Sequence, residues 1–422
     1  MEEGLKDFPV LEDFDDPSFD PFVSDEAVYG SVVDTWTPFA ELRCKGPVHE
    51  LAHRPFMGMA GDAWLGERPH VLVVGFEEAY EVLNTPEIYH QGYAHNLGVT
   101  FGHSLSVMNG AEHTKYRRIL QRAFLPQVVA KWGETMVEPV IDELLGQFEA
   151  RGHADLIDEF TQHYPFRIIY RQLGLPEEQG ALFHKLAISQ TIYWAYPDQA
   201  KEASRKLGAF FEALVEQRRR EPGGPDDLVT LMLNADVEGE GMPDDVIISF
   251  LRQLVNAAGD TTFRMTSCLL AALLENPEQY EAVRADRSLI LHSIEEGLRW
   301  EGPVLVQDRI AVADTELAGM KIAAGTYVEV AAGAANRDEA KFPDPDRFDV
   351  RRANKTSHLG FSRGPHICIG QHLARVEMTR ALNAIFDRLP NLRLDPDRPR
   401  PVIRGVTLRR PDHIFVRFDP AS

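Results

Sequence analysis

Phe361-Ser-Arg-Gly364-Pro365-His366-Ile-Cys368-Ile-Gly370 places one cysteine in a glycine-flanked loop, directly before a segment with helical periodicity. A helix N-terminus presents unpaired N–H groups and a partial positive charge, and both favour a thiolate over a thiol. Gly364 allows the backbone to approach a flat ligand, Pro365 stiffens the turn, and Phe361 is placed to cover the sulfur. A single thiolate without a neighbouring cysteine suits the axial position of a haem iron.

The alternative for Cys368 is a buried, inert cysteine, which is the usual environment of an unpaired cysteine. Six specified positions within ten residues weigh against that alternative. The chain has only three cysteines, Cys44, Cys268 and Cys368, which are odd in number and far apart in the sequence. A disulfide framework is therefore not expected, and a reducing compartment fits best.

The composition indicates a globular protein, since 44% of the 422 residues are hydrophobic. The formal net charge of -21 argues against a general nucleic-acid-binding protein. The acidic first residues do not resemble a signal peptide, and no apolar run approaches the roughly 20 residues that span a bilayer. We therefore expect a cytoplasmic protein that is not bound to a membrane.

The hydrophobic pattern predicts a mainly helical chain with a small β region, organised as a single domain over residues 1–422. The first 40 residues are expected to form an extended arm. The small sheet-rich region is placed within 41–110 and 301–350, and the helical core within 111–300 and 351–390. The most strongly patterned segments are predicted helices at 243–275, 289–300 and 371–389 and predicted strands at 70–74, 327–330 and, with turns, 405–418.

The spacing Phe-x-x-Gly-x-His-x-Cys-x-Gly resembles the haem-binding signature of the cytochrome P-450 superfamily. The resemblance implies the large single-domain P-450 fold, with a long central oxygen-binding helix, and haem b as the cofactor. It implies Cys368 as the axial ligand of the iron, with Phe361, His366 and Gly370 in the cofactor site.

Ala257-Ala258-Gly259-Asp260-Thr261-Thr262 resembles the oxygen-binding helix motif of the same superfamily. There an acid and a threonine are implied in proton delivery, and the two groups suit a relay because one exchanges protons with solvent while the other donates hydrogen bonds. Asp260 and Thr261 are accordingly the candidate catalytic residues. The usual glycine position holds Ala258, which leaves open whether the helix is distorted here. Without Cys368, hydroxyls that bond to helix carbonyls would be the simpler interpretation.

Glu296 and Arg299 lie three residues apart and so share one helix face. Glu-x-x-Arg is a weak pattern, and other copies in the chain indicate only surface pairs. The stretch that follows, Phe342-Pro-Asp-Pro-Asp-Arg347-Phe-Asp, resembles the Pro-x-Arg-Phe stretch of the family. The resemblance implies a buried structural charge network of Glu296, Arg299 and Arg347 behind the cysteine loop.

Dispersed cations match positions that contact the haem propionates in the family. His113 and Arg117 lie four residues apart on one helix face, and Arg309 and His366 fall at two further propionate positions. Such donors make charge-assisted hydrogen bonds to carboxylates. For each residue alone, a surface salt bridge is the better interpretation, and propionate binding is favoured only in combination with the cysteine loop.

Lys115, Arg118 and Arg122 form a basic stripe on the same helix, roughly opposite His113 and Arg117. The stripe is either ordinary solvated surface or a docking patch for an acidic ferredoxin-type electron donor. The chain shows no flavin, iron–sulfur or dinucleotide fingerprint, so electrons are expected from a separate ferredoxin and reductase.

The resemblance implies a monooxygenase that inserts one atom of dioxygen into an apolar small substrate, such as a terpenoid, an aromatic or an alkyl compound. Positions that line the family's pocket correspond to Leu254, Ala258, Val304, Leu305, Val306, Thr407 and Leu408, with Tyr93–Phe101 and Phe183–Trp194 as lid candidates. These residues could equally fill the core. A peroxide-driven haem-thiolate enzyme and a non-catalytic haem sensor remain open as other functions.

Overall fold

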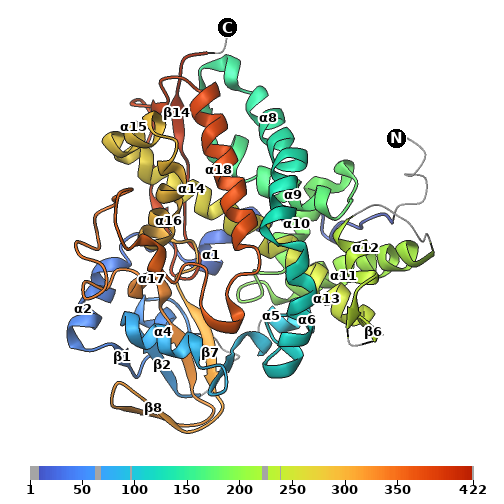
Figure 1. Cartoon of the computed structure of the whole chain (residues 1–422), viewed down its shortest axis with the longest axis vertical. Coiled ribbons are helices and arrows are strands. Elements are labelled where there is room, and N and C mark those ends of the chain that lie inside the picture. Colours follow the sequence, from blue (N-terminus) through green and yellow to red (C-terminus); the bar gives the residue numbers. More distant parts are fainter. Residues whose placement is uncertain (1–8, 62–67, 96, 221–226, 238, 421–422) are drawn as a thin grey trace. The chain divides into compact units, whose positions relative to one another are not determined.

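The computed structural model describes residues 9–61, 68–95, 97–220, 227–237 and 239–420 (Figure 1). Most of the described residues are helical and the strands are short, which confirms the mainly helical prediction. The chain divides into two compact units. Unit 1 comprises Met1–Val28, Tyr93–Val128 and Pro165–Asp260, and unit 2 comprises Tyr29–Gly92, Val129–Tyr164 and Thr261–Ser422.

Unit 1 is built mainly from helices. They are α1 (Asp25–Tyr29), α5 (Leu97–Phe101), α6 (Gly110–Ala123), α7 (Pro126–Trp132, which continues into unit 2 from Val129), α9 (Tyr164–Gln172), α10 (Gly180–Ser189), α11 (Pro197–Arg220), α12 (Leu228–Leu233) and α13 (Asp244–Ala257). Two short paired strands, β5 (Asp236–Val237) and β6 (Glu240–Gly241), precede α13. Apolar residues recur along α11 at helical spacing and bury one face, which packs against α10 and α13.

The first described residues of unit 1 form an arm that is held by charged side chains of α10 and α11. Lys206 Nζ lies 3.0 Å from Asp15 Oδ1, and Lys185 Nζ lies 3.0 Å from Asp13 Oδ1. The ring of Phe14 packs under Lys185. Acidic residues in the arm therefore have a structural role, since they neutralise lysines on the helices beneath.

Unit 2 contains the remaining helices and most of the strands. Its main helices are α2 (Trp36–Lys45), α3 (His53–Phe56), α4 (Phe76–Asn84), α8 (Glu138–Gly146), α14 (Gly259–Glu275, which begins at the end of unit 1), α15 (Pro277–Ala285), α16 (Leu289–Glu301), α17 (Ala332–Ala335) and α18 (Gln371–Arg388). In Figure 1, α8 and α18 run side by side.

A five-stranded sheet in unit 2 has the order β1-β2-β10-β7-β3. The strands are β1 (Val48–His49), β2 (His70–Val73), β10 (Tyr327–Val330), β7 (Gln307–Ala311) and β3 (Tyr89–Gln91). β2 and β10 are parallel, with Tyr327 opposite His70, and the other neighbours are antiparallel. The predicted strands at 70–74 and 327–330 are confirmed within one residue.

Successive side chains along β2 point to opposite faces of the sheet and belong to two different hydrophobic clusters. Val71 and Val73 of β2 pack with Phe76, Ala79, Val82 and Leu83 of α4. Leu72, which points to the opposite face, packs with Phe39 and Leu42 of α2. The sheet is therefore covered on both faces within unit 2.

Smaller strands complete unit 2. β4 (His153–Asp155), β14 (Phe415–Arg417) and β11 (Arg393–Leu394) form a three-stranded sheet, and β8 (Thr315–Leu317) with β9 (Met320–Ile322) and β12 (Ile403–Arg404) with β13 (Arg410–Pro411) form two-stranded ones. β13 and β14 lie within the predicted strand and turn region at 405–418.

Two expectations were wrong in their boundaries. The arm was expected to extend to residue 40, but residues 1–8 lie outside the described part, and α1 and α2 begin at Asp25 and Trp36. The helix expected over 243–275 is interrupted at Ala258, so α13 ends at Ala257 and α14 begins at Gly259. A Cβ on Gly259 would lie 2.4 Å from the Phe166 ring, so only glycine permits this close packing next to the interruption.

Candidate active site

The loop that carries Cys368 is tightly hydrogen-bonded within unit 2. The Cys368 N–H donates to the Phe361 carbonyl at 2.8 Å, and the Ile367 N–H donates to the Gly364 carbonyl at 3.1 Å. Gly364 has a φ of 67°, and a Cβ there would lie 2.4 Å from the Leu83 carbonyl oxygen of α4. Glycine is therefore required at this position both for its backbone conformation and for the close approach to α4.

The three cysteines have different environments. Cys44 is exposed, Cys268 is buried, and Cys368 is half-buried, two residues before Gly370, which caps α18. Burial raises the pKa of the Cys268 thiol well above its ordinary value, which makes this cysteine an inert core residue. Of the three, Cys368 combines access with a position at the beginning of a long helix.

Cys368 offers a single sulfur as a possible metal ligand. Within the described residues, the group of three close metal-ligating side chains is Asp155, Asp158 and His413, on other segments of unit 2. A site with a single sulfur ligand suits haem iron better than zinc, which takes several cysteine or histidine ligands.

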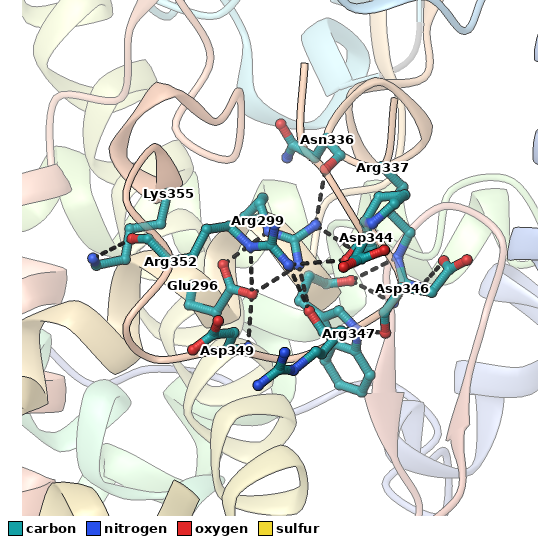
Figure 2. A network of polar contacts seen from close by, with 12 residues as sticks. Glu296, Arg299, Asn336, Arg337, Asp344, Asp346, Arg347, Asp349, Arg352 and Lys355 are labelled. Carbon is teal, nitrogen blue, oxygen red and sulfur yellow. Dashed lines mark hydrogen bonds and ion pairs between the residues drawn. The ribbon is translucent and has the colours of Figure 1, made fainter. Parts of the chain in front are cut away.

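Glu296 and Arg299 of α16 form a fully buried, two-pronged ion pair (Figure 2). Arg299 Nε and Nη2 each donate to a different Glu296 oxygen at 2.8 Å. Arg299 also donates to the carbonyls of Asn336, Pro345 and Arg347. The pair therefore joins α16 to the segment after α17, as the sequence led us to expect for these two residues.

Arg347 does not have the role that the sequence suggested. Its side chain is exposed, and it contributes its carbonyl oxygen to the network rather than its guanidinium. The guanidinium of Arg352 lies where that of Arg347 was expected, since its Nε donates to Glu296 Oε1 at 3.1 Å (Figure 2). Arg352 lies outside the Pro-x-Arg-Phe stretch, and its place depends on the turn at Asp344, which has a positive φ of 49°.

Three further residues beside the loop were not identified from the sequence. Glu295, next to Glu296 on α16, contacts both His358 and Arg375. These two residues lie on either side of Cys368 along the chain. No spacing rule indicates such a contact, because it depends on how α16 faces the two ends of the loop.

Arg309 and His366, the two expected propionate partners in unit 2, lie in different elements. Arg309 is buried on β7, and its Nη1 donates to Gln91 Oε1 of β3 at 3.1 Å. His366 is half-buried in the short 3₁₀ turn Gly364–His366 of the cysteine loop. Near this loop, the first residue of β7, Gln307, donates to the Leu359 carbonyl at 3.3 Å.

His113 and Arg117, the other expected propionate partners, share one face of α6 in unit 1. His113 is buried, and burial together with the nearby Arg117 guanidinium lowers the pKa of its imidazole to about 4. The imidazole is therefore neutral at physiological pH and can donate one ring N–H, while Arg117 carries the charge.

Asp260 and Thr261 lie in the first turn of α14, directly after the interruption at Ala258. The Asp260 side chain is buried, with only 1% of the residue exposed, while Thr261 is half-exposed. In unit 2, Thr262 hydrogen-bonds to the fully buried Glu377 of α18, and burial raises the pKa of Glu377 well above its ordinary value. α14 therefore carries an acid and two hydroxyls in consecutive positions.

The expected pocket residues of unit 2 come together on two adjacent segments. Val304 forms a β-bridge with Leu408, and the Leu305 N–H donates to the Thr407 carbonyl at 2.9 Å. Val304, Thr407 and Leu408 are half-exposed. Leu305 and Val306 instead lie in the hydrophobic cluster beneath the sheet. Leu305 Cδ1 would meet a Cβ on Gly333 at 2.4 Å, so this side chain fills the core rather than lining a pocket.

The expected pocket and lid residues of unit 1 include several interior side chains. Leu254 is buried on α13 and Ala258 is half-buried. Phe183 is fully buried, with its ring 4.7 Å from that of Phe210, and Phe101 is also buried. Within the lid candidate Tyr93–Phe101, Asn96 lies outside the described residues.

The basic stripe lies on α6 of unit 1. Arg118 and Arg122 are exposed, whereas Lys115 is half-buried with its Nζ 5.6 Å from the centre of the Tyr116 ring. His113, Tyr116, Ile119, Leu120 and Ala123 form the buried face of the helix. The two arginines are therefore available on the surface of unit 1.

Comparison with known proteins identifies extensive similarity. The family model described as Cytochrome P450 matches residues 190–416. The chain is 31% identical to the cytochrome P450 monooxygenase PikC of Streptomyces venezuelae, over 88% of this chain and 89% of that protein. It is also 31% identical to 6-deoxyerythronolide B hydroxylase of Saccharopolyspora erythraea, over 92% of this chain and 96% of that protein.

Solved structures are similar as well. CYP109E1 from Bacillus megaterium, in complex with testosterone, superimposes with a TM-score of 0.80 at 26% sequence identity. The match covers 92% of this chain and 99% of that one. Among the helices that the structure describes, none has the length and apolar character needed to cross a membrane.

The revised network predicts different effects for two arginines. We expect Arg352→Ala to lower the free energy of unfolding by about 3 kcal/mol, because it removes one partner of a buried carboxylate. Arg347→Ala should change it by less than about 0.5 kcal/mol, because the backbone carbonyl remains and the side chain is exposed. Urea unfolding of both variants measures the difference. Equal effects, or a larger effect of Arg347→Ala, would support the original assignment of the Arg347 side chain to the buried network.

Proposed function

This chain belongs to the cytochrome P450 family, and we propose that Cys368 is the residue that binds its haem iron. As a member of this family the protein binds haem b and is a haem-thiolate monooxygenase, an oxidoreductase that incorporates oxygen from dioxygen. The observation that carries the ligand assignment is the half-buried Cys368 before α18, in contrast to the buried Cys268 and the exposed Cys44.

When bound, haem supplies the activation of dioxygen, of which one atom enters the substrate and the other leaves as water. The chain supplies the ligand and its surroundings. Cys368 donates electron density through sulfur, and Phe361 limits the access of water to it. His113, Arg117, Arg309 and His366 are proposed to bind the two propionates by charge-assisted hydrogen bonds, with Gly370 leaving space beside the sulfur.

Asp260 and Thr261 are proposed to control protons. Asp260 is buried, so it does not exchange protons directly with solvent in the way that the sequence had suggested, but its carboxylate can accept a proton and pass it on. The half-exposed Thr261 Oγ1 can both donate and accept hydrogen bonds. Their adjacent positions in the first turn of α14 support this division of roles. An enzyme driven by hydrogen peroxide would not need such a pair, because peroxide already brings the protons and electrons.

The substrate is proposed to be a modest-sized apolar organic compound, such as a terpenoid, an aromatic or an alkyl compound. Support comes from the apolar character of Leu254, Ala258, Val304 and Leu408, and from the similar protein CYP109E1, which has been solved in complex with testosterone and with corticosterone. Leu305 and Val306 no longer contribute to this argument. The half-exposed Thr407 is the polar group among these positions, and His53 Nε2 lies 3.4 Å from its Oγ1.

Electrons are proposed to come from a separate ferredoxin-type protein that docks at Lys115, Arg118 and Arg122. Arg118 and Arg122 present exposed positive charge on α6 in a chain with a net charge of -21. An acidic partner would gain both steering and orientation from this patch.

Turnover of the Thr261→Ala variant tests the monooxygenase proposal. With reduced ferredoxin and dioxygen, we expect product formed per electron pair to fall about tenfold or more, with hydrogen peroxide released instead, because proton delivery is impaired. Thr261→Ser, which retains the hydroxyl, should stay close to the unmodified protein. Product that forms with added peroxide but not with reductant and dioxygen would contradict the proposal.

A ligand screen tests the substrate class. We expect terpenoid, aromatic or alkyl compounds to shift the absorption spectrum of the haem, since burial of apolar surface provides most of the binding free energy. A panel of charged, water-soluble compounds serves as the comparison. Spectral shifts confined to that charged panel would exclude the proposed class.

Charge reversal tests the docking surface. The double variant Arg118→Glu/Arg122→Glu should slow reduction by ferredoxin about tenfold at low salt, with a smaller effect at high salt because ions screen the patch. Arg219→Glu/Arg220→Glu changes the net charge equally on exposed residues of α11 and is the control for net charge, although it also breaks the ion pairs of these arginines with Asp244 and Glu216. An unchanged reduction rate at low salt would remove this surface from the proposal.

A further inference from the structure

Glu295 connects the two ends of the cysteine loop. Its Oε1 accepts from Arg375 Nε at 2.6 Å, and its Oε2 accepts from Arg375 Nη2 at 3.2 Å. The same Oε2 lies 3.1 Å from His358 Nε2. His358 precedes Cys368 and Arg375 follows it, so one carboxylate of α16 closes the base of the loop.

The hydrogen bonds of His358 show which of its ring nitrogens carries the hydrogen. The Gly360 N–H donates to His358 Nδ1 at 3.0 Å, so Nδ1 is the acceptor nitrogen. Nε2 therefore carries the hydrogen and donates to Glu295, which corresponds to a neutral imidazole. Burial lowers the pKa of His358, and the charges of Arg375 and Arg363 act in the same direction, while Glu295 opposes them. Arg375 and His358 in turn hold the pKa of Glu295 at about 2 despite its burial.

Both partners of Glu295 flank Phe361. The Arg375 guanidinium lies 4.5 Å from the centre of the Phe361 ring, and the His358 ring lies 6.1 Å from it. The carbonyl of Phe361 accepts the Cys368 N–H at 2.8 Å. The position of Phe361 is therefore coupled to the peptide of the cysteine through the backbone and to Glu295 through two side chains.

Another ion pair on α18 shows why this one is different. Arg380 Nη1 lies 2.7 Å from Glu138 Oε1, which joins α18 to the start of α8. The Glu138 side chain is 42% exposed, whereas that of Glu295 is 6% exposed. Both pairs connect α18 to another helix, but of the two only the Glu295 pair also involves a residue that contacts the Phe361 ring. A comparison of variants at Glu295 and Glu138 therefore distinguishes the attachment of α18 from the positioning of the cysteine loop.

We propose that Glu295 is a positioning residue that acts through His358 and Arg375 to fix Phe361 and the Cys368 peptide, and so sets the surroundings of the sulfur. The inference rests on the proposed role of Cys368 as the iron ligand. Loss of the carboxylate releases both ends of the loop base, which allows water to approach and hydrogen-bond to the sulfur. Such outer contacts tune both the strength of a metal–ligand bond and its potential.

The test uses the haem-containing Glu295→Gln variant at a temperature well below unfolding. We expect the reduced, carbon-monoxide-bound protein to lose the absorption band of thiolate ligation about tenfold faster than the unmodified protein, in line with the effect of removing outer partners of metal ligands. We also expect the midpoint potential of the haem to rise, because a hydrogen-bonded sulfur donates less electron density.

Glu138→Gln is the matched control and should leave both readouts unchanged, although it also removes an ion pair from α18. Arg375→Lys is the second variant, to be used if Glu295→Gln does not take up haem. It retains the charge but loses the two-pronged geometry, so both readouts should move in the same direction by a smaller amount.

The outcomes separate this inference from the ligand assignment. A thiolate band in the unmodified protein, together with Glu295→Gln and Arg375→Lys variants that match Glu138→Gln in both readouts, would overturn the positioning role alone. If Glu295→Gln only lowered the thermal unfolding midpoint, with no change in the rate of loss of the thiolate band or in the haem potential, Glu295 would be a stabilising contact alone. That result would also overturn the proposal. Absence of the thiolate band from the unmodified protein would overturn the ligand assignment and this inference together.

Discussion

The buried contact between Glu296 and Arg299 is the interaction on which the surroundings of the cysteine loop depend. Two charges without solvent exposure are costly unless every charged atom finds a partner. Arg299 meets this requirement through three carbonyls beyond its carboxylate, and Glu296 accepts further bonds from Arg352 and from the Asp349 N–H. The segment from Asn336 to Arg352 is therefore folded around the guanidinium, so that its path is set by hydrogen-bond geometry as well as by apolar packing.

Other buried acids of α16 are paired in the same way, so that three carboxylates of this helix each contact at least one arginine. Glu295 contacts Arg375, Glu296 contacts Arg299 and Arg352, and Glu301 contacts Arg409 and Arg337. Successive residues on a helix point about 100° apart, so neighbouring acids reach different segments of unit 2. The helix thus fixes the cysteine loop, the segment before it and the C-terminal strands by separate contacts.

The sequence was informative where a pattern reflects local chemistry. The cysteine loop, the strand at 327–330 and the Glu296–Arg299 pair could be predicted because each depends on residues close together in the chain. Arg352 and the Glu295 contacts could not be predicted, because each depends on how distant segments meet. Arg347 was chosen for its place in a motif, but the folded segment presents its carbonyl to the network. Leu305 was assigned to a pocket from its position, yet a glycine on α17 leaves space for its side chain in the core.

The central claim is that Cys368 is the thiolate ligand of the haem. The most direct test is the absorption spectrum of the reduced, carbon-monoxide-bound protein, measured for the unmodified chain and for Cys368→Ser. We predict the long-wavelength Soret band of thiolate ligation in the unmodified protein and its loss in Cys368→Ser. A band that persists in Cys368→Ser, or that is absent from the unmodified protein, would contradict the account.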